Sequence, residues 1–507
     1  MKINIFASSD VHGFIDGFDY AKDNNCKNSL AAINNYINIY NDNNIILVDN
    51  GDMIQGNFID NFIEYEKHPA ISIMNYMSYD IWNLGNHEFN YGVKNLKNVI
   101  KQFKGETLMA NSNDDFFTPY TIIERNNIKI GFIGINTPLI NVFESKKALG
   151  DLEILNPIPV LEKALDNLSK KTDAIIGLFH LGLNDENAVL NSGLKSILNN
   201  LKNKEYLDAV VLGHTHQKIE KEIIDGVLVT QPFVYGKYLA HIELEFNGNK
   251  LVNKNSELID ISKYPIDKNI TEFFKPYKEH IFSFTHEVLG YIENANEHVD
   301  VNLEDTPLAH LISDIMLSFK KADVTAFQID NNDAVLKNGA IRRCDMANLY
   351  SYAGGEVSLY EITGLDLKRY MEWSAGYFDK INGKIVVNEK RGQLKYKTFD
   401  IFGNIKYLID LDCERGKRIK NLKFMNGKEI LDDEKLIIAV NEYRMNFLTS
   451  ESGPLSDRSF TKIISSKYQD DNGKKHGTIR GDLAEKFFSS LKNKTYIVDN
   501  KKNFYIK

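Results

Sequence analysis

Short apolar runs recur along the first half of the chain, and each of them ends in polar residues. The runs cover residues 3–7, 45–48, 81–84, 128–135, 174–179 and 209–212. Runs of this length are typical of buried strands. Segments with helical spacing lie between several of them, for example at residues 29–40 and 160–168. Strands that alternate with helices predict an α/β domain in which β-sheets and helices form layers.

The pattern changes between residues 260 and 286. Residues 262–265 have the composition of a loop, and residues 269–282 then show helical spacing with several aromatic rings on one side. Pro276 is expected to kink or interrupt this helix, because proline lacks the N–H group that a helix uses. We therefore interpret this stretch as a connector between two domains.

The second half of the chain again mixes strands with helices. The predicted strands are 358–362 and 435–440, and the predicted helices are 306–319 and 366–374. We therefore expect an N-terminal domain over residues 1–261, a connector or hinge helix over residues 262–285, and a C-terminal α/β domain over residues 286–507.

Composition and charge argue against one class of function. The chain has 507 residues, a formal net charge of -8 and a pI of about 5.9. A protein that binds duplex nucleic acid needs a basic surface to meet the phosphates, so we expect no nucleic-acid partner. A small phosphorylated substrate is compatible with this acidic composition, because bound metal ions supply positive charge locally. Three widely separated cysteines show neither a disulfide framework nor zinc-ligand spacing.

The N-terminus enters a strand pattern directly, in the sequence MKINIFASSD. A secretory signal has an apolar segment of about 7–15 residues and a cleavage site, and neither is present. No apolar run reaches the roughly 18 residues that a membrane-spanning helix needs. We therefore expect a cytoplasmic protein without a membrane partner, or a secreted or periplasmic one if a leader has been removed. The oligomeric state is not predicted.

Side chains of the metal-binding types follow the predicted strands, at the points where these strands end. The five fragments are Asp10 and His12 in SSDVHG, Asp52 in DNGDMIQG, Asn86, His87 and Glu88 in GNHEFNYG, His180 in FHLG, and His214 and His216 in GHTH. In open α/β sheets, ligands bind beyond the carboxyl ends of the strands. Each fragment alone is more often an ordinary loop. Five of them in order, each after an apolar run, favour one common site.

The residue types suit a pair of divalent ions. Carboxylates, imidazoles and an amide oxygen are ligands for Mn, Fe, Co or Zn. A carboxylate can bridge two ions, and Asp52 is the natural candidate for that position. Two ions about 3.5–4 Å apart activate water and neutralise phosphoryl oxygens together. The pattern therefore indicates a metal-dependent phosphoesterase, and the identity of the metal stays open.

The order DVHG, GDMIQGN, GNHEF, HLG and GHTH resembles that of the calcineurin-like metallophosphoesterases. More narrowly, the chain resembles the family of 5′-nucleotidases and 2′,3′-cyclic-nucleotide 2′-phosphodiesterases/3′-nucleotidases, over almost its whole length. The resemblance implies an N-terminal metallophosphoesterase domain of layered β-sheets flanked by helices, and a C-terminal 5′-nucleotidase-type α/β domain. It also implies a substrate that spans both domains and a rotation of the second domain about the connector.

The resemblance implies a role for each candidate residue of the metal site. The first ion would be held by Asp10, His12, Asp52 and His216, and the second by Asp52, Asn86, His180 and His214. His87 would lie beside the scissile phosphate, stabilise charge and protonate the leaving oxygen, while a metal-bound hydroxide attacks phosphorus. Many 5′-nucleotidases have an Asp three residues after this His, where this chain has Asn90. An amide stabilises an imidazolium less than a carboxylate does, which weakens the resemblance to the 5′-nucleotidases. The stretch GNHEFNYG with Asn90 resembles the cyclic-phosphodiesterase branch more closely.

Recognition of a nucleobase usually needs aromatic faces for stacking. Residues 396–411 and 439–447 are the candidate segments in the second half. By the resemblance, Phe399 and Tyr443 would sandwich the base, although either ring alone is more often a core residue. Arg342, in the segment NGAIRR, would meet phosphate or ribose oxygens through its guanidinium group. A solvated surface arginine is the alternative.

We therefore expect a dimetal hydrolase of nucleotide phosphate esters, with a small-molecule nucleotide as its partner. The favoured activity is that of a 2′,3′-cyclic-nucleotide 2′-phosphodiesterase/3′-nucleotidase. A 5′-nucleotidase or a nucleotide-sugar hydrolase is the alternative on the same scaffold. A protein that binds nucleotides without hydrolysing them is a third alternative, and the presence of all seven ligand residues speaks against it.

Overall fold

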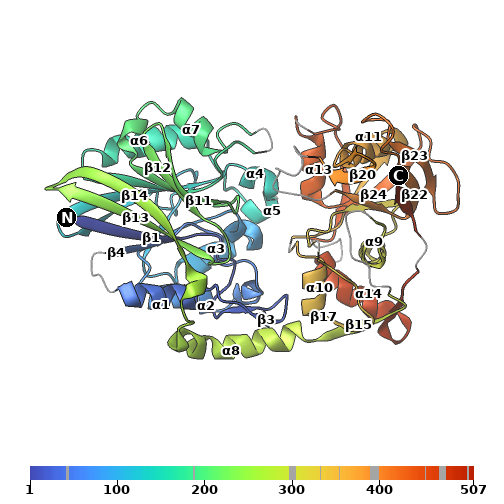
Figure 1. Cartoon of the computed structure of the whole chain (residues 1–507), viewed down its shortest axis with the longest axis horizontal. Coiled ribbons are helices and arrows are strands. Elements are labelled where there is room, and N and C mark those ends of the chain that lie inside the picture. The colour runs from blue at the N-terminus through green and yellow to red at the C-terminus, as the bar shows by residue number, and fades with distance from the viewer. Residues whose placement is uncertain are drawn as a thin grey trace. The chain divides into compact units, whose positions relative to one another are not determined.

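The structure is a computed structural model that divides into two compact units, Met1–Phe282 and Ser283–Lys507 (Figure 1). It describes residues 1–40, 45–144, 146–186, 189–295, 304–331, 333–352, 354–388, 399–451, 453–467, 476–499 and 502–507. Both units combine helices with β-sheets, which confirms the predicted two-domain α/β class.

Two six-stranded β-sheets form the centre of the first unit. The first sheet has the order β14–β13–β1–β4–β5–β6, with β1 (Lys2–Ser8), β4 (Ile45–Asp49), β5 (Ile81–Asn83), β6 (Glu106–Leu108), β13 (Tyr238–Asn247) and β14 (Lys250–Asp260). The second sheet has the order β11–β12–β10–β9–β8–β7, with β7 (Tyr120–Arg125), β8 (Ile128–Asn136), β9 (Ala174–His180), β10 (Ala209–Leu212), β11 (Lys218–Ile224) and β12 (Val227–Pro232). The pairs β1–β4, β4–β5, β8–β9 and β9–β10 are parallel. The carboxyl ends of these strands therefore lie at a common edge of each sheet.

Helices cover the outer faces of both sheets, so the first unit has four layers (Figure 1). Ile5 of the first sheet and Ile176 of the second belong to one buried cluster between the sheets. Phe6 points to the other face of its sheet, because side chains alternate along a strand, and shares a cluster with helices α1 (Leu30–Tyr40) and α2 (Pro69–Tyr76). Helices α6 (Pro157–Leu168) and α7 (Leu194–Asn200) cover the second sheet. The predicted layering of sheets and helices is confirmed.

The shorter elements of the first unit lie mainly in the connections between its strands. They are β2 (Phe18–Asp19), β3 (Asn24–Asn25), α3 (Val93–Ile100), α4 (Ile140–Phe143), α5 (Lys146–Leu149) and the 3₁₀ turns η1 (Ile59–Phe62), η2 (His87–Tyr91), η3 (Lys204–Tyr206) and η4 (Ile261–Lys263). All six strands predicted for the first half of the chain are present, to within one residue at each end.

Helix α8 (Lys268–Thr285) is part of the first unit over most of its length. Three of its apolar side chains are buried in the cluster that contains Phe6, namely Ile270, Phe274 and Ile281. The boundary after Phe282 therefore differs from the expected one after residue 261, because the apolar face of the helix packs onto the first unit. Pro276 lies inside α8 and does not end it.

A five-stranded sheet forms the centre of the second unit, in the order β21–β16–β24–β18–β25. Its strands are β16 (Val324–Phe327), β18 (Ser358–Thr363), β21 (Ile401–Gly403), β24 (Lys435–Val440) and β25 (Lys462–Ser465). The helices are α9 (Pro307–Phe319), α10 (Arg343–Leu349), α11 (Gly364–Ala375), α13 (Glu442–Thr449) and α14 (Ala484–Ser490). The smaller sheets use β15 (Val288–Glu293), β17 (Gly339–Arg342), β19 (Phe378–Ile381), β20 (Lys384–Val387), β22 (Ile405–Ile409), β23 (Ile419–Phe424), β26 (Thr495–Ile497) and β27 (Phe504–Ile506). The strands and helices predicted for this half are present.

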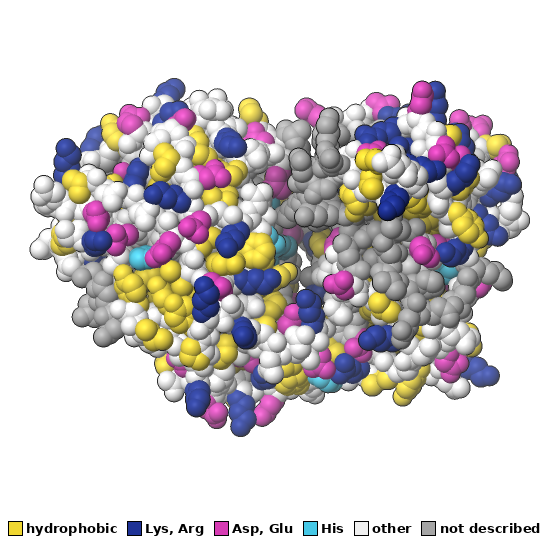
Figure 2. Space-filling model, in the orientation of Figure 1, with side chains coloured by type: hydrophobic (Ala, Val, Ile, Leu, Met, Phe, Trp, Pro, Cys, Tyr) yellow, Lys and Arg dark blue, Asp and Glu magenta, His cyan; other side chains and the backbone are white. Residues whose placement is uncertain are grey.

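The surface of the first unit carries charges of both signs. Figure 2 shows its basic and acidic side chains interspersed over the face in view. Among the helices that the structure describes, none has the length and hydropathy of a membrane-spanning segment.

His68 makes the stability of the first unit dependent on pH. Its side chain is completely buried before helix α2, and burial lowers its pKa to about 3. The unfolded chain, with a pKa near 6.5 at this residue, binds the proton first as pH falls. The contribution of the neutral His68 side chain to the free energy of unfolding is therefore fully present above about pH 6.5, and it is lost progressively as pH falls towards 3. From pH 7 to pH 5 the loss amounts to about 2 kcal/mol.

The His68→Leu variant should consequently lose less thermal stability than the wild type when pH falls from 7 to 5. Melting temperatures at both pH values, measured by calorimetry, provide the comparison. His280→Leu is the matched control, since His280 is solvent-exposed and its replacement should leave the acid sensitivity unchanged. Equal acid sensitivity in wild type and His68→Leu would contradict the prediction that protonation of His68 contributes to the loss of stability at low pH.

Candidate metal centre

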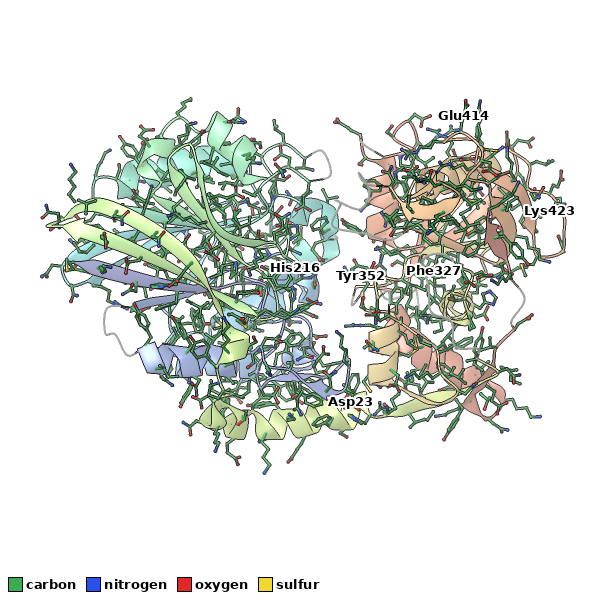
Figure 3. All side chains as sticks on the ribbon, in the orientation of Figure 1. Asp23, His216, Phe327, Tyr352, Glu414 and Lys423 are labelled. Carbon is green, nitrogen blue, oxygen red and sulfur yellow. The ribbon has the colours of Figure 1, made fainter. Side chains whose placement is uncertain are left out.

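The seven predicted metal ligands lie where strands of both sheets end. They are Asp10 and His12 after β1, Asp52 after β4, Asn86 after β5, His180 at the end of β9, and His214 and His216 after β10. Parallel strands present their carboxyl ends at the same edge, so these positions gather in one place. His216 is labelled in Figure 3 and lies in the first unit.

Five of these side chains form two overlapping groups whose ligand atoms lie within 4.8 Å of one another. The groups are Asp10, His12 and His216, and Asp10, Asp52 and His180. The Nε2 atoms of His12 and His216 are 3.2 Å apart, and Asp52 Oδ2 lies 3.1 Å from His180 Nε2. Two ligands that each lie about 2.0–2.2 Å from a tetrahedral ion are separated by roughly 3.3–3.6 Å. The observed spacings are close to those around a common ion.

Asn86 and His214 join the same centre. His214 Nδ1 lies 2.7 Å from Asn86 Oδ1. The backbone N–H of His214 donates to both carboxylate oxygens of Asp10, at 3.0 and 3.2 Å. The structure thus brings all seven predicted ligands together, and their division between two ions stays a prediction.

The buried polar atoms of the centre fit divalent cations. Asp10, Asp52 and His180 are almost inaccessible to solvent, and buried carboxylates are costly without a counter-charge. Asp52 Oδ2 and His180 Nε2 form an ion pair at 3.1 Å, but neither atom makes a well-aligned hydrogen bond within the described residues. Buried polar atoms are nearly always paired, so this pair indicates a place for a ligand.

The charges of the centre suit metal coordination. Burial opposes ionisation of Asp52, but His180 and His87 outweigh it and hold the pKa of this carboxyl well below its usual range. Burial lowers the pKa of His12 to about 4, so its imidazole is neutral at pH 7. Burial also opposes the charge on His180, but Asp52 and Asp10 raise its pKa to about 10. A cation would displace this proton, which couples metal affinity to pH.

Five of the seven ligands have a left-handed backbone conformation. The φ angles are 53° at Asp10, 49° at His12, 58° at Asp52, 66° at His214 and 51° at His216. This conformation costs on the order of 1–3 kcal/mol for each non-glycine residue, and such residues concentrate at functional sites. Backbone hydrogen bonds hold the first loop in place, from Asp10 N to Gly51 O and from His12 N to Asp52 O, both at 2.9 Å.

Glu88 ties two ligand loops together, although the sequence assigns it no role beyond its place in the polar cluster. Its fully buried carboxylate accepts the backbone N–H groups of Asp52 at 2.8 Å, Met53 at 2.7 Å and Gly85 at 2.7 Å. It therefore fixes the loop after β4 against the loop after β5. An acidic residue directly after Asn-His is the only local signal for this function.

The predicted pair of His87 and Asn90 is in contact. His87 Nδ1 lies 2.8 Å from Asn90 Oδ1 within the turn η2. The backbone N–H of His87 also donates to Asp52 Oδ1 at 2.8 Å, which places the ring beside the metal centre. Asn90 Nδ2 donates in turn to Glu144 Oε1 at 2.5 Å. The sequence does not reveal Glu144, because it lies 54 residues away from Asn90.

Tyr443 lines a cavity of the second unit. The other aromatic side chains of this cavity are Phe327, Tyr350, Tyr352 and Tyr370, of which Phe327 and Tyr352 are labelled in Figure 3. Arg444 also lines the cavity, and its Nε forms an ion pair with Asp400 Oδ2 at 2.9 Å. This arginine directly follows Tyr443 within the candidate segment 439–447, although no role was predicted for it.

Phe399 does not line that cavity. Its ring is 1% exposed and packs edge-on against Phe378, with 4.8 Å between ring centroids, and against Phe504. A ring without a free face cannot stack on a base, so the expected Phe399–Tyr443 sandwich is not present in the structure. Residues 396–398 of the same segment lie outside the described residues.

Arg342 is engaged within its own segment. Its Nε and Nη2 atoms donate to the carboxylate of Asp345, each at 3.1 Å, at the start of helix α10. The side chain is 31% exposed. The structure thus gives this guanidinium group an ion pair with Asp345, and a contact with substrate oxygens stays a prediction.

Comparison with protein families finds a calcineurin-like phosphoesterase over residues 3–218 and a 5′-nucleotidase C-terminal domain over residues 288–448. A trifunctional nucleotide phosphoesterase of Bacillus subtilis is 26% identical over 527 residues, covering 88% of this chain and 36% of the relative. A 2′,3′-cyclic-nucleotide 2′-phosphodiesterase/3′-nucleotidase of Haemophilus influenzae is 27% identical over 541 residues, covering 88% of this chain and 80% of the relative. The chain thus spans about a third of the Bacillus protein and most of the Haemophilus one.

Solved structures support the same fold. A Staphylococcus aureus protein crystallised with alpha-ketoglutarate matches the whole chain with a TM-score of 0.83 at 20% identity. A 5′-nucleotidase precursor from Thermus thermophilus covers the whole chain, and 99% of its own, with a TM-score of 0.68 at 17% identity. The chain therefore combines a calcineurin-like phosphoesterase domain with a 5′-nucleotidase C-terminal domain.

Proposed function

We propose that the protein hydrolyses nucleotide phosphate esters with two divalent metal ions, as a 2′,3′-cyclic-nucleotide 2′-phosphodiesterase/3′-nucleotidase. The observation that carries the proposal is the convergence of seven ligand side chains, five of them in two groups that share Asp10. The resemblance in sequence to the Haemophilus enzyme of that name supports the choice of substrate.

The seven side chains would hold the ions as the family pattern implies. Asp52 would bridge, because it lies in the second group and its Oδ2 is also 3.9 Å from His12 Nε2 of the first. When bound, two ions of Mn, Zn, Fe or Co would activate water for attack on phosphorus and neutralise the phosphoryl oxygens. Glu88 would keep the loop of Asp52 in register with the loop of Asn86.

His87 would act on the leaving oxygen. Its Nδ1 is held by Asn90, so Nε2 is the ring nitrogen that can meet the substrate. A positioned imidazolium that donates a proton to a leaving alkoxide contributes typically about 10²–10⁴-fold to the rate. The nucleoside leaving group needs this proton, since an alkoxide is a poor leaving group.

A substrate panel tests the proposal. Hydrolysis of 2′,3′-cyclic AMP, 3′-AMP, 5′-AMP and a nucleotide sugar would be measured with Mn²⁺ present. We expect the highest kcat/KM for the cyclic nucleotide and 3′-AMP. Higher values for 5′-AMP or the nucleotide sugar would instead establish the second candidate function, which the match to a 5′-nucleotidase C-terminal domain favours. Tight nucleotide binding without any hydrolysis would overturn both.

Tyr443 is the residue that we expect to contact the base. Stacking of a base on an aromatic ring contributes roughly 1–3 kcal/mol, so Tyr443→Ala should raise the KM for 3′-AMP about tenfold. Hydrolysis of p-nitrophenyl phosphate, which has no base, should be unchanged. Tyr505→Ala, at an exposed position of the same unit, is the matched control. Equal losses on both substrates would exclude a stacking role for Tyr443.

A further inference from the structure

A continuous line of hydrogen bonds runs from His87 through Asn90 to Glu144. His87 Nδ1 lies 2.8 Å from Asn90 Oδ1, and Asn90 Nδ2 lies 2.5 Å from Glu144 Oε1. Glu144 is 8% exposed and ends helix α4, where its backbone N–H donates to Ile140 O at 2.8 Å. A buried carboxylate on an anchored backbone is thus directed at the amide that holds His87.

The carboxylate determines which way the amide faces. An ionised carboxylate only accepts hydrogen bonds, so it must meet the NH₂ end of Asn90. The amide oxygen is then turned towards His87. An oxygen also only accepts, so His87 Nδ1 must carry a hydrogen. Without Glu144, the amide could rotate by half a turn and present its NH₂ group to the ring, which would require the opposite tautomer.

We propose that Glu144 is a positioning residue that acts through Asn90 and sets the orientation and tautomer of His87. In this arrangement Asn90 contacts the His87 ring, and Glu144 supplies the negative charge behind Asn90. The pair would thereby replace a carboxylate that contacts the ring directly. The inference rests on the proposed function in one respect, namely that His87 serves the reaction. The contacts that select the tautomer are independent of that role.

A swap of the two side-chain types tests the line of contacts. Asn90→Asp alone places two carboxylates together and should lower kcat for 3′-AMP by about 10–100-fold. The double variant Asn90→Asp/Glu144→Gln restores complementary partners, because the new amide donates and the new carboxylate accepts. It should recover kcat to within about threefold of the wild type. A double variant no better than Asn90→Asp would overturn the proposal.

Single replacements of Glu144 supply a second readout. Glu144→Ala should lower kcat for 3′-AMP about tenfold with little change in KM. Hydrolysis of p-nitrophenyl phosphate should fall far less, because its leaving group needs no proton. Equal losses on both substrates would indicate a merely structural role. Glu144→Gln keeps the side-chain volume and covers the case in which Glu144→Ala does not fold.

The tautomer can be read without any enzymatic activity. In protein labelled with ¹⁵N-histidine, ring nitrogen shifts should show His87 with its hydrogen on Nδ1, and Glu144→Ala should shift it towards the other form. His87→Gln assigns the signal. Glu257→Gln is the control, because Glu257 contacts His241 at 3.0 Å outside the metal centre. An unchanged His87 signal would overturn the inference, whereas a wild type inactive on every nucleotide would overturn only the proposed function.

Discussion

Replacement of Asp52 by Asn should lower kcat by about a thousandfold or more. Two bound ions would contribute several kcal/mol of charge stabilisation in the transition state, and about 4 kcal/mol corresponds to three powers of ten. Asp52 is buried, its Oδ2 faces His180 at 3.1 Å, and its Oδ1 accepts the backbone N–H of His87. The amide would keep the shape of the side chain and remove the charge with which Asp52 is proposed to hold both ions.

Metal analysis of the variant separates this explanation from simple misfolding. Asp52→Asn should bind fewer than two ions while its melting temperature stays close to that of the metal-free wild type. Asp16→Asn is the matched control, since Asp16 is also buried but pairs with Lys278 at 2.9 Å. The control should retain full metal content and turnover. An Asp52→Asn variant that binds two ions and has a normal kcat would show that Asp52 is not a ligand of the metal centre.

Replacement of Phe399 by Ala should destabilise the second unit by about 3–5 kcal/mol. The ring is fully buried between Phe378 and Phe504, and deletion of such a ring leaves a cavity. Activity on 3′-AMP and on p-nitrophenyl phosphate should then fall together, in proportion to the folded fraction. Denaturant unfolding followed by both assays provides the measurement.

A loss of activity that is confined to nucleotide substrates would instead support a contact between Phe399 and the base. A selective rise in the KM for nucleotides, with the melting temperature unchanged, would require the ring to become exposed when the substrate binds. Ile463→Ala is the control, because this apolar side chain is 55% exposed and its loss should leave stability and both activities nearly unchanged.

The convergence of the seven candidate ligands was predictable from the sequence because each of them follows its strand within a few residues. Strand ends can be read from apolar runs, and parallel strands place their ends together. Glu144 could not be found in this way, because its contact with Asn90 joins distant parts of the chain. The left-handed backbone at Asp10 and Asp52 was equally hidden, because it results from loop closure and not from residue type.

Side-chain burial was harder to predict than the elements themselves. The aromatic rings of residues 269–282 are expected on one side of a helix, yet Phe274 is fully buried and Phe273 is 49% exposed. The helical period shows an apolar face but not the surface that covers it, so α8 was interpreted as a connector. The position of Phe399 was hard to interpret for the same reason. A motif shows where a residue lies in the chain, but it does not show which side chains surround the ring.

The β13–β14 hairpin was missed although a local signal exists. Gly248 and Asn249 lie between the two strands, because Asn247 pairs with Lys250, and Gly248 has a φ of 60°. A Gly-Asn pair between two strand patterns indicates a hairpin, because glycine readily adopts the positive φ that the first central position of a type II′ turn needs. The many charged residues of β14 concealed its strand character, because β14 lies at the edge of its sheet.

A count of bound ions tests the dimetal centre most directly. Metal-free protein would be dialysed to equilibrium against Mn²⁺, and the ions per chain would be measured by mass spectrometry alongside hydrolysis of 3′-AMP. We predict two ions per chain, loss of hydrolysis on chelation and its return when Mn²⁺ is added back. One ion or none in protein that still hydrolyses the ester would contradict a centre of seven ligands and two metals.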